Sequence, residues 1–283
     1  MTPTVNTTRE LAAFLRDRRQ RLNPQDLGLP ARRQRRTPGL RREEVAELAG
    51  VSIDYIVRLE QGRGLHPSAE VLTALSRALR LTDDERGYLF ALARQRAPSV
   101  GKPATAPTPA LAQLVDDLSP RPAMVVNHRF DVLAWNTEMA TLVIDFASLP
   151  ERHRNSMWLC LLEPSMRDFY VERERTIREG IADLRAAWAG HPDDQVLADL
   201  IAEFTEHSAE FQAAWARHDV RVQGRGRKQL FHRTVGRVVV DYEVLLPLRE
   251  PDQRVIIYRA ADEVSQRALD RLVAEPEAAA VSE

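Results

Sequence analysis

The sequence predicts two domains, an all-helical one at the N-terminus and an α+β one at the C-terminus. A chain of 283 residues is long enough for about two domains of ~100–200 residues each. Residues 7–94 follow a helical periodicity, whereas strand-like and helical segments mix after residue 110. Between them, residues 96–109 (RAPSVGKPATAPTP) contain four prolines, which is typical of a semi-extended linker. We therefore expect a helical domain at 1–95, a linker at 96–109, a second domain at 110–262 and a tail at 263–283.

Within the helical domain, residues 42–61 (REEVAELAGVSIDYIVRLEQ) predict two helices joined by a tight turn. Ala46 is small where the two helices would touch, and Gly50 suits the left-handed backbone of the turn. Ser52 follows as the N-cap of the second helix. Apolar residues stand where such a motif needs an interior: Val45, Ala49, Val51, Ile56 and Leu59. This combination indicates a DNA-binding helix-turn-helix, although an ordinary helical hairpin is the simpler alternative.

The outward side of the second helix provides the candidate base contacts. Arg58 could donate to guanine, Asp54 could accept from cytosine, and Ile53 and Val57 could contact thymine methyl groups. The full set of candidate readers is Ser52, Ile53, Asp54, Tyr55, Val57, Arg58 and Gln61.

Basic residues are concentrated near this motif. Residues 1–96 carry 18 basic and 12 acidic residues, whereas the rest of the chain carries 22 and 29. A basic N-terminal region is typical of a protein that binds a polyanion. The alternative is that the basic residues form a solvated surface loop. The candidate phosphate contacts are Arg32, Arg33, Arg35, Arg36, Arg41, Arg42 and Arg63.

The second domain alternates strands with a helical segment. Strands are predicted at 122–126, 130–135, 228–232, 237–246 and 254–258, with Asn127, His128 and Arg129 as the first turn. Asn136 suits a helix N-cap, residues 164–217 follow a helical pattern, and GRGRK (224–228) is expected to be a turn. The tail from Glu263 is expected to be a frayed helix.

Several classes of protein are disfavoured by the composition. No apolar run approaches the ~18 residues that span a bilayer, and the N-terminus lacks the pattern of a secretory signal. Cys160 is the single cysteine and is expected to be a buried structural residue. The histidines show no metal-ligand spacing, and no acid–base or nucleophile constellation is present. We expect a cytoplasmic protein without membrane contact, metal, cofactor or enzymatic activity.

Two groups of segments together resemble a known family. PGLRREEVAELAGVSIDYIVRLEQGR and HPSAEVLTALSRALRLTDDER resemble Xre/Cro-type helix-turn-helix proteins, and more narrowly the MmyB-like regulators. PAMVVNHRFDVLAWN, FQAAWARHDV and GRVVVDYEVL resemble the MmyB-type ligand-binding domain. The resemblance covers most of residues 9–260. It implies a five-helix DNA-binding domain, a PAS-like sensor domain, homodimers on a double-stranded operator, and a pocket for fatty-acid-like molecules.

Given such a sensor domain, some side chains are candidates for an elongated apolar ligand with one polar end. Val238, Val240 and Tyr242 share one strand face with Val244 and Leu246 and could form an apolar floor. The candidate walls are Trp135, Phe211 and Trp215, and the candidate carboxylate donors include His218 and His232. A packed core without a cavity is the alternative.

Three functions remain open at this point. The first is a transcription regulator that responds to a ligand. The second is a DNA-binding protein whose C-terminal domain serves only dimerisation or protein-partner binding. The third is an enzyme with a DNA-binding head, which the absence of a catalytic constellation in the sequence disfavours.

Overall fold

The computed structural model describes residues 7–27, 39–63, 66–93, 104–250 and 252–280. The chain forms two compact units, each built from separate stretches of sequence. The helical unit comprises residues 1–100, 185–202 and 215–222. The sheet unit comprises residues 101–184, 203–214 and 223–283.

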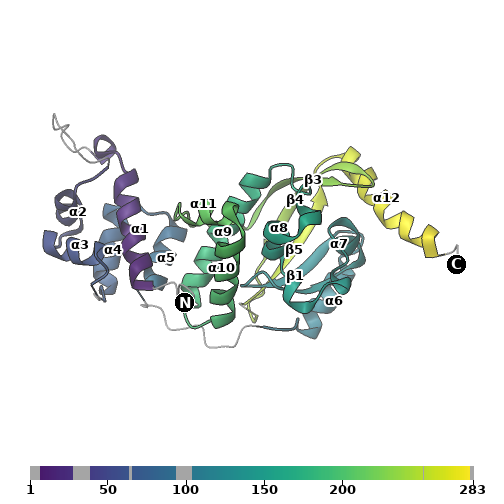
Figure 1. The fold of residues 1–283 in the computed structure, drawn as a ribbon, viewed down its shortest axis with the longest axis horizontal. Coiled ribbons are helices and arrows are strands. Elements are labelled where there is room, and N and C mark those ends of the chain that lie inside the picture. The colour runs from purple at the N-terminus through teal and green to yellow at the C-terminus, as the bar shows by residue number, and fades with distance from the viewer. Residues whose placement is uncertain (1–6, 28–38, 64–65, 94–103, 251, 281–283) are drawn as a thin grey trace. The chain divides into compact units, whose positions relative to one another are not determined.

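Among its described residues, the helical unit contains five N-terminal α-helices, the number that the resemblance implied (Figure 1). They are α1 (Thr7–Arg21), α2 (Arg42–Ala49), α3 (Ile53–Glu60), α4 (Ala69–Ala78) and α5 (Asp83–Leu92). Ser68 caps α4 and Thr82 caps α5, each accepting a backbone N–H of the first helical turn. Their apolar faces meet in a core that includes Phe14, Leu72 and Leu89.

The turn between α2 and α3 has the predicted local structure. Gly50 has a φ of 65°, the left-handed conformation that favours glycine. Ser52 Oγ accepts the backbone N–H of Tyr55 at 3.1 Å, which confirms the predicted N-cap. The interior positions are buried at Val45, Ala46, Ala49, Ile56 and Leu59, whereas Val51 is only partly buried.

In the described part of the chain, the sheet unit is built on five antiparallel strands in the order β2-β1-β5-β4-β3. They are β1 (Ala123–Asn127), β2 (Val132–Trp135), β3 (Arg225–His232), β4 (Gly236–Leu245) and β5 (Gln253–Ala260). All five lie where strands were predicted. However, β3 begins at Arg225, so the expectation that GRGRK is a turn was wrong. Pairing of Arg225 with Glu243 and Gly226 with Tyr242 on β4 extends the strand, and such pairing is not a local property of the sequence.

Helices cover both faces of this sheet. On one face, Leu111 and Val115 of α6 (Pro109–Asp117) pack against Val125 and Val255. The other face holds the larger core, to which α7 (Thr137–Leu142), α8 (Ser156–Leu162) and α12 (Glu263–Ala280) contribute. The helix predicted from Glu263 is thus present and has an apolar side, since Ala268, Leu269 and Leu272 are buried.

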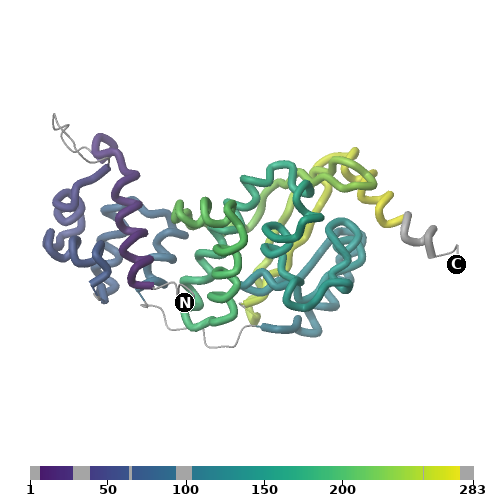
Figure 2. Tube along the Cα trace, in the orientation of Figure 1, coloured from purple at the N-terminus to yellow at the C-terminus, as the bar shows by residue number. Residues whose placement is uncertain are grey.

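The predicted helical segment between the strands contains α9 (Arg173–Gly190), α10 (Gln195–His207) and α11 (Ala209–Trp215). By the residue ranges given above, each of these helices has residues in both units, and Figure 2 traces the three helices along the chain. Short 3-10 helices lie at Pro24–Leu27, Phe146–Ser148, Glu151–His153 and Pro164–Met166. Among the described residues, no helix combines the length and apolar character needed to cross a membrane.

Candidate nucleic-acid interface and ligand pocket

Helix α3 presents a surface of mixed polar and apolar side chains. Ile53 keeps 49% of its surface exposed at the first position of the helix. Asp54 and Arg58, one helical turn apart, are also exposed. Among the other predicted readers, Ser52 and Gln61 are exposed and Tyr55 and Val57 are partly buried. The surface therefore offers a donor, an acceptor and an apolar group side by side, the chemistry that base edges require.

The predicted phosphate contacts differ in what the structure says of them. Arg32, Arg33, Arg35 and Arg36 lie outside the described residues. Arg63 is exposed just beyond α3. Arg41 stands at the N-cap of α2, where its backbone N–H donates to Glu44 Oε2 at 2.7 Å.

A buried ion-pair network holds the end of α3 in place. Arg19 of α1 donates to Glu60 through Nε at 2.6 Å and through Nη2 at 3.1 Å. The half-exposed Arg42, predicted to contact phosphate, donates to the same carboxylate at 2.7 Å. Arg19 also donates to the carbonyl of Leu40, and Arg16 to that of Glu60. Glu60 thus fixes the C-terminal end of α3 against α1 and α2, and the sequence pattern carried no signal for it.

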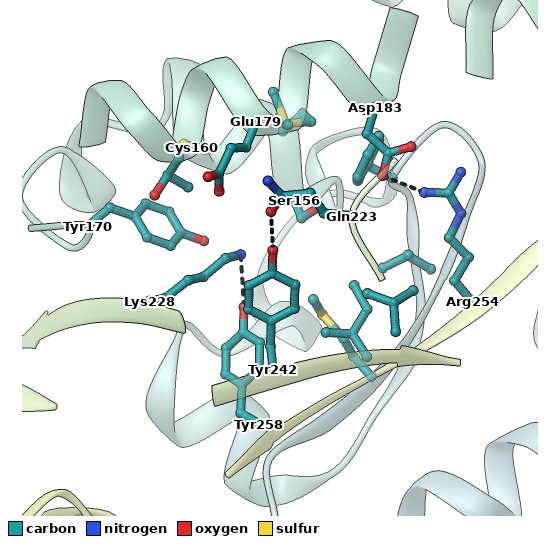
Figure 3. Close-up of a pocket in the computed structure, with 18 residues that line it drawn as sticks. Ser156, Cys160, Tyr170, Glu179, Asp183, Gln223, Lys228, Tyr242, Arg254 and Tyr258 are labelled. Atoms are coloured by element: carbon teal, nitrogen blue, oxygen red, sulfur yellow. Dashed lines mark hydrogen bonds and ion pairs between the residues drawn. The ribbon is translucent and has the colours of Figure 1, made fainter. Parts of the chain in front are cut away.

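The sheet unit encloses a cavity of about 100 Å³ on the face of the larger core (Figure 3). Apolar side chains of the sheet form one side, among them Met124, Val126 and Ile256. Helices α8 and α9 form the other side, with Met157 and Gly180 among their lining residues.

One lysine stands inside this cavity among three tyrosines. Lys228 pairs with Val240 in the β3–β4 register and so faces the cavity side of the sheet. Its Nζ lies 5.0 Å from the ring centroid of Tyr242, 5.5 Å from that of Tyr170 and 5.7 Å from that of Tyr258. It also donates to Tyr258 Oη at 3.3 Å. Burial opposes the charged form of Lys228, whereas the tyrosines around it and the hydrogen bond to Tyr258 favour it, and on balance its pKa is raised.

The sheet register explains how these side chains meet. Tyr242 and Tyr258 are directly paired across β4 and β5. The residue opposite Tyr242 on β3 is Gly226, where a Cβ would lie 2.8 Å from the tyrosine ring. Glycine therefore lets this ring lie across β3. Tyr170 comes from the segment that bridges the outer edge of β3 at Leu230.

The other charged side chains that line the cavity have ion-pair partners. Asp183 accepts from Arg254 Nη1 at 2.7 Å, and Glu179 lies 3.4 Å from Arg175, which also pairs with Glu172 at 3.2 Å. Among the described residues, Lys228 forms no ion pair with a carboxylate. Lys228 is thus a buried cation without a carboxylate partner in the described part of the chain, which favours a bound anion.

Cys160 also lines the cavity, and its environment makes it unreactive. Burial raises the pKa of its thiol to about 11, so the nucleophilic thiolate is scarce at neutral pH. This agrees with its predicted structural role.

Of the predicted ligand contacts, Tyr242 and Val244 line this cavity. Val238 and Val240 are fully buried in the adjoining core, Trp135 packs on Phe146, and Phe211 packs on Phe204. His232 lines a separate hollow with Arg233, whereas Trp215 and His218 belong to the helical unit. Sequence reasoning missed Lys228, because the strand containing it was expected to begin only at that residue.

Comparison with known families gives two matches. Residues 107–272 match the MmyB-like transcription regulator ligand binding domain, which covers more than half of the chain. Residues 10–89 match a helix-turn-helix domain. No curated protein matches the chain as a whole or in part.

Proposed function

The chain belongs to the MmyB-like transcription regulators, and from this premise we propose that α3 reads a double-stranded operator under the control of a fatty-acid-like anion bound beside Lys228. Its helix-turn-helix and ligand-binding domains make it a DNA-binding transcription regulator with a ligand-binding domain.

The exposed side of α3 supports the assignment of the base contacts. We propose that Arg58 donates to guanine, Asp54 accepts from cytosine and Ile53 contacts a thymine methyl group. The remaining readers are Ser52, Tyr55, Val57 and Gln61. Phosphate contacts would come from Arg41, Arg63 and the arginines of the 32–36 segment, with Arg42 exchanging part of its ion pair for a phosphate.

The single observation that carries the ligand proposal is the uncompensated ammonium of Lys228. A carboxylate head would supply its missing counter-charge, and the hydroxyl groups of Tyr170 and Tyr258 could donate to the same oxygens, whereas Tyr242 Oη already donates to Gln223 Oε1. Because Asp183 and Glu179 each have an arginine partner, a ligand head with one negative charge is favoured over a head with two. An acyl chain would extend along the apolar side, where Met124 and Met157 have unbranched side chains that adapt to its shape.

We further propose a homodimer in the cytoplasm. A single helix-turn-helix reads few base pairs, and two half-sites about one helical turn apart are the usual remedy. Light scattering of the protein free and on DNA tests this directly, and a monomer in both states would contradict it.

The experiment combines operator selection with a ligand series. Duplexes that the full chain retains are selected from random DNA, and operator affinity is then measured by fluorescence anisotropy with fatty acids of increasing length. Each methylene that enters the cavity should tighten binding by ~0.8 kcal/mol, or about fourfold, until the cavity is filled. The methyl ester and the trimethylammonium analogue of the same chain length are the matched controls.

Two results would overturn the proposal. If no duplex is preferred over random DNA, α3 does not read a sequence. If the acid, the ester and the cationic analogue bind equally, or none binds and the purified protein contains no extractable lipid, the ligand assignment fails. The dimerisation-only alternative would then gain support.

A further inference from the structure

A buried charge cluster lies at the start of α1 in the helical unit. Arg185, fully buried, donates to Glu10 Oε1 and to the carbonyl of Trp215. The same carboxylate oxygen accepts from Tyr88 Oη at 2.8 Å and lies 2.9 Å from His218 Nδ1. The Arg185 guanidinium also stacks 3.9 Å from the ring centroid of Trp215.

The cluster joins helical elements that are far apart in the sequence. Glu10 belongs to α1 and Tyr88 to α5, whereas Arg185 lies on α9 and His218 follows α11. Further bonds fix the 215–222 segment to the same helices: Arg18 of α1 donates to the carbonyl of His218 at 2.5 Å. These later segments are thus an integral part of the helical unit.

Helix α1 ends beside α3, the helix that we propose reads the operator. Its Glu10 sits in the cluster, and Arg19, nine residues later, binds Glu60 at the end of α3. An α-helix of this length is a stiff rod, so a displacement at Glu10 is carried to Arg19. Both ends are buried ion pairs, which a small displacement breaks or re-forms rather than stretches, because an unpaired buried charge is costly.

Helix α9 begins at the ligand cavity. Its residues Thr176, Glu179, Gly180 and Asp183 line the cavity, and Arg185 follows only two residues after the last of them. A rigid shift of α9 on ligand entry therefore moves Arg185 as well, since both belong to one continuous helix.

We propose that Arg185 is the positioning residue that couples the cavity to DNA reading, through Glu10, α1 and the Arg19–Glu60 pair. This inference rests on the proposed function, because it assigns the regulation of the same ligand site. In this proposal the Arg185–Glu10 cluster has two arrangements, and the shift of α9 on ligand entry selects between them. Neither the cavity nor the operator is contacted by Arg185 itself.

The test uses the full-length Arg185→Lys protein, with Arg86→Lys on the exposed side of α5 as the matched control. Lysine keeps the positive charge but lacks the two guanidinium nitrogens with which arginine donates to Glu10 and to the Trp215 carbonyl at the same time. Tetradecanoate affinity, operator affinity with and without tetradecanoate, and hydrogen exchange of α1 and α3 are measured for each. Tyr88→Phe, which removes one bond to Glu10 and keeps the ring, serves as a milder second variant.

For the wild type and for Arg86→Lys, tetradecanoate should change operator affinity by about 5- to 150-fold, the usual range of such coupling. Arg185→Lys should bind tetradecanoate within about twofold of the wild type, yet its operator affinity should no longer respond, and its α3 exchange should not change. Tyr88→Phe should reduce the response partly. If Arg185→Lys does not fold, the test rests on Tyr88→Phe. An undiminished change in its operator affinity on addition of tetradecanoate would overturn the proposed coupling through Arg185 and Glu10.

The failures of the two proposals are distinguishable. If wild-type protein binds no tetradecanoate, or binds it without any change in operator affinity, the proposed function fails. If tetradecanoate changes the operator affinity of the wild type and of folded Arg185→Lys equally, the ligand acts by another route. In that case only the coupling through Arg185 and Glu10 is refuted.

Discussion

Replacing Lys228 by methionine tests the ligand site at the ammonium group that has no carboxylate partner among the described residues. Methionine has a similar length and fills the space between the three tyrosine rings without an ammonium group. The substitution removes three cation–π contacts of about 0.5–2 kcal/mol each and a weak hydrogen bond to Tyr258. It also removes a buried charge whose desolvation costs several kcal/mol. We therefore expect the free energy of unfolding to stay within about 2 kcal/mol of the wild-type value or to rise.

Ligand affinity should respond much more strongly than stability. A hydrogen bond between charged groups contributes about 1.5–3 kcal/mol, so loss of the ammonium should weaken carboxylate binding by about 10- to 100-fold. Binding of the uncharged methyl ester should change little, because the apolar side of the cavity is intact. The difference between acid and ester thus isolates the charge from the fit.

The assay follows displacement of a fluorescent fatty acid, together with urea unfolding of both proteins. Lysine-selective isotope labelling adds a direct observation, since Lys228 and Lys102 are the two lysines in the sequence. In the wild type, the NMR signal of Lys228 should move when tetradecanoate is added, and that of Lys102 should serve as the reference. If the methionine variant binds the acid as tightly as the wild type does, the ammonium is not the anchor of the ligand.

Four further substitutions test other parts of the structure. Glu60→Gln leaves its buried arginine partner without a counter-charge and should lower the free energy of unfolding by about 3–5 kcal/mol; unchanged urea unfolding would contradict this. Arg58→Ala should cost about 1–3 kcal/mol of preference for operator over random DNA, and an unaltered ratio of dissociation constants would show that it reads no base. Burial opposes ionisation of Glu10, but its hydrogen bond to His218 and the charge of Arg185 hold its pKa below the ordinary 4.5, so the carboxylate stabilises the fold above that pH. The stability difference between wild type and Glu10→Gln should accordingly shrink as pH falls below 4.5 towards the folded-state pKa, and a constant difference would refute the assignment. Gly180→Ala places a Cβ 2.6 Å from Met157 Sδ and should press that flexible side chain into the cavity, weakening ligand binding without lowering the melting temperature.

The helix-turn-helix and the strands could be predicted because their signals are local. Gly50 and Ser52 shape the backbone within one turn, and apolar periodicity selects the buried side of each helix or strand. The same holds for Asn136, whose side chain accepts the N–H of Met139 at the predicted N-cap. Such features depend on neighbours within about four residues, and a single sequence contains that information.

The candidate site depended on contacts between residues far apart in the sequence. Lys228 looked like part of a basic turn, and only the β3–β4–β5 register brings it beside Tyr242 and Tyr258. Glu10 and Arg185 are 175 residues apart, and each alone resembles an ordinary surface charge.

The sequence alone was enough to predict most helices and strands, the DNA-binding motif and the family to which the chain belongs. Which charges are buried, and which buried charges have no carboxylate partner, became visible only in the folded structure. The physical reason is that desolvation and ion pairing arise from the packing of distant segments, whereas helix caps, turns and periodicity arise from adjacent residues.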